Sequence, residues 1–137
     1  MNVLVDTSVW SLSLSLRRAK RIDETASKEL AELIREGRVV MIGPIRQELL
    51  SGIKVKSQFD LLRDHLRAFS DLTLDVADYE DAAEAFNRCR ERGIQGSNTD
   101  FLICAAALRR ELAVYTTDND FLQYGKVLKL KLHEPRG

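Results

Sequence analysis

The sequence predicts an α/β fold in which helices cover both faces of a mostly parallel sheet of four or five strands. Short unbroken apolar runs alternate along the chain with longer segments whose apolar residues recur at helical spacing. The chain has 137 residues, of which 45% are hydrophobic and 31% charged, as is typical of one globular domain. We therefore expect a single three-layer α/β/α domain spanning residues 1–137.

The chain begins with a predicted strand that runs directly into a helix. Residues 3–5 (Val-Leu-Val) form a buried-strand pattern, and the polar residues 6–8 can end this strand and cap a helix. Apolar residues then recur at helical spacing in residues 24–36, and Gly37 follows where a left-handed residue is favoured. This second segment is therefore predicted to be an amphipathic helix.

The middle of the chain repeats the alternation of strand and helix. Residues 39–42 predict a second strand, which Gly43 and Pro44 end, and Pro44 favours the first turn of another helix. Apolar spacing predicts a further helix over residues 59–69, followed by a brief third strand at residues 72–74. Each strand is thus separated from the next by helical sequence.

The last third of the chain contains the most apolar predicted helix. Residues 79–89 share one apolar helical face that ends near Gly93, and the almost wholly apolar residues 97–108 predict a buried helix. Residues 113–116 predict a fourth strand, and residues 127–130 an optional fifth. Sheets of this kind place functional sites outside the carboxyl ends of their strands.

Composition indicates where the protein works. Cys89 and Cys104 lie on apolar helix faces without Cys-x-x-Cys spacing, so we expect two buried free thiols. The first residues carry no basic leader, and the longest apolar run, residues 101–108, is too short to span a bilayer. We therefore expect a cytoplasmic protein without a membrane segment.

Charge is balanced overall but unevenly distributed. The 21 basic and 21 acidic residues cancel, so net charge neither predicts nor excludes nucleic-acid binding. A basic cluster could contact RNA phosphate or a protein partner, although both this cluster and a later acidic stretch are compatible with solvated helix surface. The basic cluster is Arg17, Arg18, Lys20 and Arg21. The acidic stretch is Asp71, Asp75, Asp78, Glu80, Asp81 and Glu84.

Four carboxylates occupy positions where strands end or helices begin. Asp6 directly follows the first strand, and Asp118 follows the fourth. Asp100 lies in the first turn of the apolar helix, and Glu48 lies one turn inside the helix after the second strand. All four could meet in the crevice outside the carboxyl ends of the central strands.

Each of these acids also has a purely structural interpretation. Asp6 and Asp118 could cap a helix or a turn. Asp100 completes a capping-box pattern with Ser97, and Glu48 could be an ordinary solvated helix residue. The ordered set of four is much less expected by chance than any one of them.

A cluster of four carboxylates would require a cation, because like charges repel and raise one another's pKa values. Hard oxygen ligands select Mg²⁺, Mn²⁺ or Ca²⁺. Zinc is disfavoured because His65 and His133 lie in no plausible ligand cluster. A carboxylate-held Mg²⁺ supplies the chemistry that phosphodiester cleavage needs, although one or two ions would both serve.

Four segments of the sequence together resemble the PIN-domain family of ribonucleases. They are residues 5–10 (VDTSVW), 44–49 (PIRQEL), 98–106 (NTDFLICAA) and 116–121 (TTDNDF). The resemblance covers essentially the whole chain and no further domain is expected, which is similar to the stand-alone VapC-type toxins of bacterial toxin–antitoxin pairs. It implies a single PIN-like domain.

The resemblance also implies which residues form the site. The matching acids are Asp6, Glu48, Asp100 and Asp118. Of these, Asp6, Asp100 and Asp118 are the expected metal ligands, and Asp120 is an additional acid that could replace Asp118. The expected hydroxyl partners of the acids are Ser8 and either Thr116 or Thr117, with plain helix capping as the alternative.

The function implied by the resemblance is Mg²⁺- or Mn²⁺-dependent cleavage of RNA by a homodimer. A cognate antitoxin would block the cleft and bind operator DNA, so the toxin would reach DNA only through the antitoxin. The alternatives are a receiver-like Mg²⁺-binding signalling domain, an inactive PIN scaffold that only binds a partner, and a structure-specific DNA nuclease. The first lacks an adjacent acidic pair after the first strand, the second conflicts with the four acids, and the third usually needs a larger chain.

Overall fold

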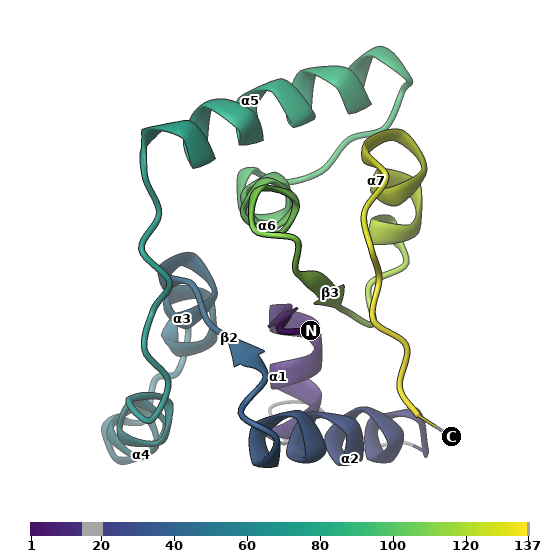
Figure 1. Cartoon of the computed structure of the whole chain (residues 1–137). Helices are drawn as coiled ribbons and strands as arrows, with labels where there is room; N and C mark the ends of the chain where they lie inside the picture. Colours follow the sequence, from purple (N-terminus) through teal and green to yellow (C-terminus); the bar gives the residue numbers. More distant parts are fainter. Residues whose placement is uncertain (15–20, 137) are drawn as a thin grey trace.

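The structure, a computed structural model, describes residues 1–14 and 21–136 (Figure 1). Its sheet is parallel, with the strand order β2-β1-β3, and Val3 of the central strand lies opposite both Val39 and Ala113. The strands are β1 (Val3–Val5), β2 (Val39–Val40) and β3 (Ala113–Tyr115). The predicted α/β class with a parallel sheet is confirmed, but the described residues form three strands rather than four or five.

Helices lie on both sides of this small sheet. In Figure 1, α6 with α5 beyond it lies on one side of the strands, and α1 with α2 lies on the other. The described helices are α1 (Thr7–Ser13), α2 (Arg21–Arg35), α3 (Gly43–Leu50), α4 (Lys56–Leu66), α5 (Val76–Glu91), α6 (Asn98–Arg109) and α7 (Asp120–Leu128). None of them is long and apolar enough to cross a membrane.

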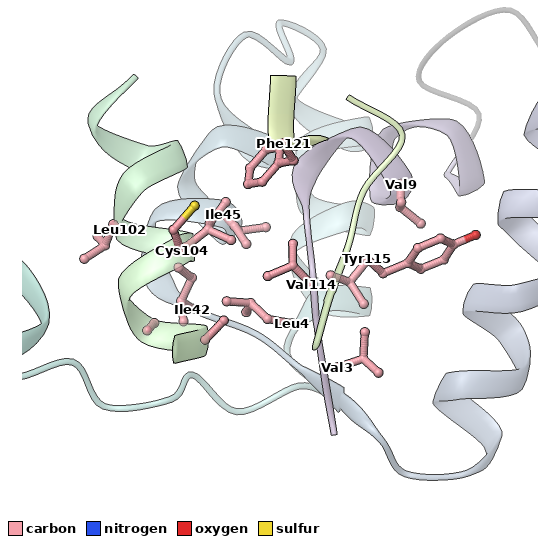
Figure 2. Packing of buried hydrophobic residues seen from close by; sticks show 14 of the residues in the cluster. Val3, Leu4, Val9, Ile42, Ile45, Leu102, Cys104, Val114, Tyr115 and Phe121 are labelled. Carbon is pink, nitrogen blue, oxygen red and sulfur yellow. The ribbon is translucent and has the colours of Figure 1, made fainter. Parts of the chain in front are cut away.

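The core forms where the apolar faces of these elements meet the sheet. Leu4 and Val114 point toward α6, whereas Val3 and Tyr115 point to the opposite face, as the alternation of side chains along a strand requires (Figure 2). Residues 101–107 of α6 are all buried, which confirms the predicted buried helix. This rigid packing fixes the positions at which the strands end and the helices begin.

Two predicted strands are wrong. Residues 72–74 contribute a single backbone hydrogen bond to the sheet region, from the Leu72 N–H to the Met41 carbonyl (2.8 Å), because the capping turn of α5 begins immediately afterwards at Asp75. Residues 127–130 contain the end of α7, which stops at Leu128. The chain forms a helix there instead of a strand, because Phe121, Tyr124 and Leu128 recur at helical spacing and are all buried.

Smaller predictions can also be checked. Gly37 adopts the left-handed conformation (φ 68°) expected after the helix that precedes it. Cys89 and Cys104 are buried free cysteines as predicted, and burial raises the pKa of both thiols. Asp78 corrects the interpretation of the acidic stretch as solvated helix surface, because its side chain is wholly buried.

The predicted basic cluster falls largely outside the described residues. Of its four residues, the structure describes only Arg21, which is the first residue of α2. The other three, Arg17, Arg18 and Lys20, lie outside the described residues. A contact between this cluster and RNA or a protein partner therefore stays a prediction.

Candidate active site

Asp6 lies where β1 ends and α1 begins, at the centre of the carboxyl edge of the sheet. Its backbone N–H donates to the Tyr115 carbonyl of the neighbouring strand (2.8 Å), which fixes the main chain at this point. Asp6 is the N-cap residue of α1, but its side chain makes no capping hydrogen bond. The capping interpretation of this carboxylate is therefore not realised, although the side chain is only 5% exposed.

Two hydroxyl groups hold the Asp6 carboxylate. Ser8 Oγ and Thr116 Oγ1 each donate to Asp6 Oδ2 at 2.8 Å. Thr116 Oγ1 in turn accepts from the backbone N–H of Asp118 (2.9 Å), and Ser8 Oγ accepts from that of Thr117 (3.0 Å). Of the two candidate threonines, Thr116 is thus the one whose side chain contacts the acid, while Thr117 contributes its main chain.

Burial outweighs hydrogen bonding in its effect on the pKa of Asp6. Burial raises the pKa of this carboxyl group, and the hydrogen bonds from Ser8 and Thr116 offset that rise only in part. No described arginine or lysine forms an ion pair with it. Asp6 is therefore an acid buried with hydroxyl partners instead of a cation.

Asp100 is positioned by the first turn of α6. Its backbone N–H donates to Ser97 Oγ (3.0 Å), so Ser97 caps the helix, while the Asp100 carboxylate accepts from the Tyr124 hydroxyl through Oδ2 (2.7 Å). Burial raises the pKa of Asp100, and the negative charges of Asp6 and Asp118 raise it further, whereas the Tyr124 hydrogen bond lowers it. Asp100 therefore interacts electrostatically with both Asp6 and Asp118.

Glu48 and Asp118 complete the set from two further elements. Glu48 lies on α3 and accepts from the Thr7 hydroxyl of α1 through Oε1 (2.7 Å). Asp118 follows β3, and its Oδ1 accepts from the backbone N–H of Asp120 (2.9 Å), so its turn-capping role is realised. The Asp120 side chain itself lies outside the cleft described next.

All four predicted acids line one cleft of about 600 Å³ at the carboxyl edge of the sheet. Its lining residues are Asp6, Thr7, Ser8, Pro44, Gln47, Glu48, Ser51, Thr99, Asp100 and Asp118. No basic side chain appears among them. The described lining of the cleft is therefore acidic, which favours the binding of a cation.

The donor set fits a hard divalent cation. Across residues 1–14 and 21–136, no three His, Cys, Asp or Glu side chains stand together as a ready-made metal site, so the predicted ligand set Asp6, Asp100 and Asp118 stays a prediction. The cleft offers carboxylate, amide and hydroxyl oxygens without His or Cys. Such donors suit Mg²⁺, which keeps several waters and needs only one or two carboxylates together with substrate phosphate.

Sequence reasoning missed several residues of this region. Thr7 and Tyr124 each hydrogen-bond one of the acids, and Gln47 and Ser51 line the cleft beside Glu48. The α3 residues could have been found from helical spacing, since positions 47, 48 and 51 share one side of a helix. No local pattern links Tyr124 to Asp100, because α7 reaches the cleft only through the tertiary fold.

Comparison with known proteins identifies the family of the chain. The model of the PIN domain family matches residues 3–127, and the chain belongs to this family. PIN domains are generally nucleases. A search of curated proteins finds no match.

Several solved structures share the fold over nearly the whole chain. FitAcB from Neisseria gonorrhoeae is 22% identical, with a TM-score of 0.75 and 97% of each chain covered. VapBC2 from Rickettsia felis, bound to a promoter DNA fragment, is 16% identical, with a TM-score of 0.75 and coverage of 97% and 98%. VapBC-1 from nontypeable Haemophilus influenzae is 16% identical, with a TM-score of 0.72 and 98% of each chain covered. At these identities the similarity shows the fold alone.

Proposed function

We propose that the protein is a metal-dependent endoribonuclease that acts as the toxin of a toxin–antitoxin pair. The observation that carries the proposal is the cleft, in which four carboxylates from four separate elements gather without a basic side chain among the lining residues. Placing several acids together in this way costs stability unless a cation is bound. Membership of a nuclease family supports the same conclusion.

The residues of the cleft divide the work as follows in this proposal. A bound Mg²⁺ or Mn²⁺ would activate water and stabilise charge on the scissile phosphate. Asp6, Asp100 and Asp118 would hold the ion, and Glu48 would orient water in the same cleft. Ser8 and Thr116 fix the Asp6 carboxylate through Oδ2, so that its orientation is set before substrate arrives.

The partners follow from the same family context. The structural neighbours include VapBC complexes, one of them bound to promoter DNA. We propose that a cognate antitoxin covers the acidic cleft of this chain and that contact with operator DNA runs through the antitoxin. A homodimer, as the resemblance implies, and a cytoplasmic location, as the sequence indicates, belong to the same proposal.

The direct test uses the full chain purified without antitoxin. It is incubated with mixed cellular RNA and Mg²⁺ or Mn²⁺, with EDTA and Asp6→Ala as controls. Discrete fragments that disappear with EDTA and with the variant are expected. Intact RNA in the presence of folded protein and metal would contradict the proposal and favour a scaffold that only binds a partner.

A further inference from the structure

Tyr124 joins α7 to the acidic cleft through one hydrogen bond. Its side chain is completely buried, and its hydroxyl donates to Asp100 Oδ2 at 2.7 Å across 24 residues of sequence. The Ser97 side chain also lowers the pKa of Asp100, but by less than the Tyr124 hydrogen bond does. The Tyr124 hydroxyl thus holds one oxygen of a carboxylate that also lines the cleft.

Aromatic packing fixes the Tyr124 ring. The ring centroid lies 4.9 Å from that of Phe101 in α6 and 5.0 Å from that of Phe121 in α7. These contacts involve the ring alone, and a phenylalanine would make them equally well. The hydroxyl is thus an addition to the packing, and its one described hydrogen bond is to a carboxylate of the cleft.

Gly96 provides the space that this hydroxyl occupies. A Cβ at position 96 would lie far closer to the Tyr124 hydroxyl oxygen than van der Waals contact allows, 2.7 Å from Cζ of the same ring and 3.0 Å from Cε2 of Phe101. The backbone of Gly96 does not adopt a positive φ, so conformation does not require glycine there. The requirement is for room, and the ring cannot give way easily because Phe101 and Phe121 hold it.

We infer that Tyr124 is a positioning residue that orients the Asp100 carboxylate toward the cleft, with Gly96 as the residue that leaves room for it. The inference rests on the proposed metal-dependent function, because it assigns the orientation of Asp100 a role in metal binding. Partners that orient a ligating carboxylate affect metal affinity by about 10- to 100-fold in known sites. A tyrosine that only filled the core would have no such effect.

The test compares two hydroxyl deletions in the full chain. Tyr124→Phe removes the hydrogen bond to Asp100, and Tyr115→Phe removes the hydroxyl of another buried tyrosine, whose ring packs on His133 instead. Mn²⁺ affinity is measured by isothermal titration calorimetry, and thermal melting checks folding. We expect Tyr124→Phe to bind Mn²⁺ at least about 10-fold more weakly than wild type, and Tyr115→Phe to bind as wild type does.

A second pair of variants tests the space at position 96. Gly96→Ala should push the Tyr124 hydroxyl away from Asp100 and weaken Mn²⁺ binding, whereas Gly125→Ala adds a Cβ that meets its nearest neighbour at an ordinary 3.8 Å. Wild-type affinity in a folded Tyr124→Phe protein would overturn the inference while leaving the proposed function intact. A wild-type protein that binds no Mn²⁺ and cleaves no RNA would instead contradict the proposed function, and the inference with it.

Discussion

Asp6 and Asp78 are both buried aspartates, but their surroundings are opposite. Asp78 is wholly buried between α5 and α6, where Arg109 and Arg110 hold both of its oxygens at 2.6–2.9 Å. These guanidinium groups hold the pKa of Asp78 well below its usual range. Asp6 is almost as buried but has two hydroxyl partners and, within the part of the chain that the structure describes, no guanidinium partner, so burial raises its pKa.

The difference separates a structural acid, Asp78, from Asp6, which we propose to be functional. A buried carboxylate paired with arginines joins two helices, and removing it leaves uncompensated positive charge. A buried carboxylate without a cationic partner carries a desolvation cost that no ion pair offsets, which is typical of functional sites. Burial of an acid therefore reveals little until its partners are known.

Asp6→Asn should have the largest effect on activity and no cost in stability. Asparagine keeps the shape and the oxygen that accepts from Ser8 and Thr116 but loses the charge. Cleavage of RNA should fall by roughly 1000-fold, because metal stabilisation is worth several kcal/mol. The melting temperature should equal or exceed that of wild type. Wild-type cleavage by this variant would remove Asp6 from the site.

Asp78→Asn should show the reverse pattern. Loss of the ion pairs with Arg109 and Arg110 should lower the free energy of unfolding by about 2–3 kcal/mol, less than for a fully buried pair because both arginines are partly exposed. Urea unfolding measures this change, and the cleavage rate per folded molecule should not change. If Asp78→Asn instead lost activity and kept its stability, Asp78 would behave as Asp6 is expected to, and the contrast between the two acids would be wrong.

Thr116→Val should lower the cleavage rate by about 10-fold, because it removes one of the two hydroxyl groups that orient Asp6. Thr117→Val is the matched control, since Thr117 contacts Ser8 through its backbone N–H. The rates of both variants are measured at saturating Mg²⁺. Equal losses in the two would mean that local packing and not the Asp6 hydrogen bond is responsible.

The pH dependence of stability should differ in sign between the two aspartates. The raised pKa of Asp6 destabilises the folded state when the group is charged, so the gain from Asp6→Asn should be present at pH 7 and vanish below about pH 4, the unfolded value. The lowered pKa of Asp78 stabilises the folded state above about pH 4, and this contribution is lost as pH falls. Both signs are checked by thermal melts of wild type and the two variants in EDTA between about pH 3 and pH 7. At each pH the melting temperature of the variant is compared with that of wild type.

Much of the fold could be predicted from local pattern, but the strands predicted at residues 72–74 and 127–130 are wrong for different reasons. The apolar run of α6 and the strand that precedes Asp6 are dominated by burial, which the sequence records directly. Residues 127–130 have strand-like composition, but the helical recurrence of Phe121, Tyr124 and Leu128 extends α7 into them. A short apolar segment does not distinguish strand from helix when both would bury the same side chains.

The convergence of the four acids on one cleft could be predicted because most of them lie at junctions between elements, where chain order alone suggests it. Their partners could not. Tyr124 reaches Asp100 from a helix that sequence reasoning had partly assigned to a strand, and Asp78 looks like any other acid in its stretch. Both contacts depend on how helices pack, which no spacing within one element encodes.

We propose that the acids of the cleft, which have no described cationic partner, hold the metal that RNA cleavage requires. Asp78, which is paired with two arginines, stabilises the fold instead. The most direct measurement is the Mg²⁺-dependent cleavage rate of one single-stranded RNA, per folded molecule, for wild type, Asp6→Asn and Asp78→Asn. Our account predicts EDTA-sensitive cleavage by wild type and Asp78→Asn at similar rates, and a rate roughly 1000-fold lower for Asp6→Asn. Equal rates for all three proteins, or cleavage that survives EDTA, would contradict it.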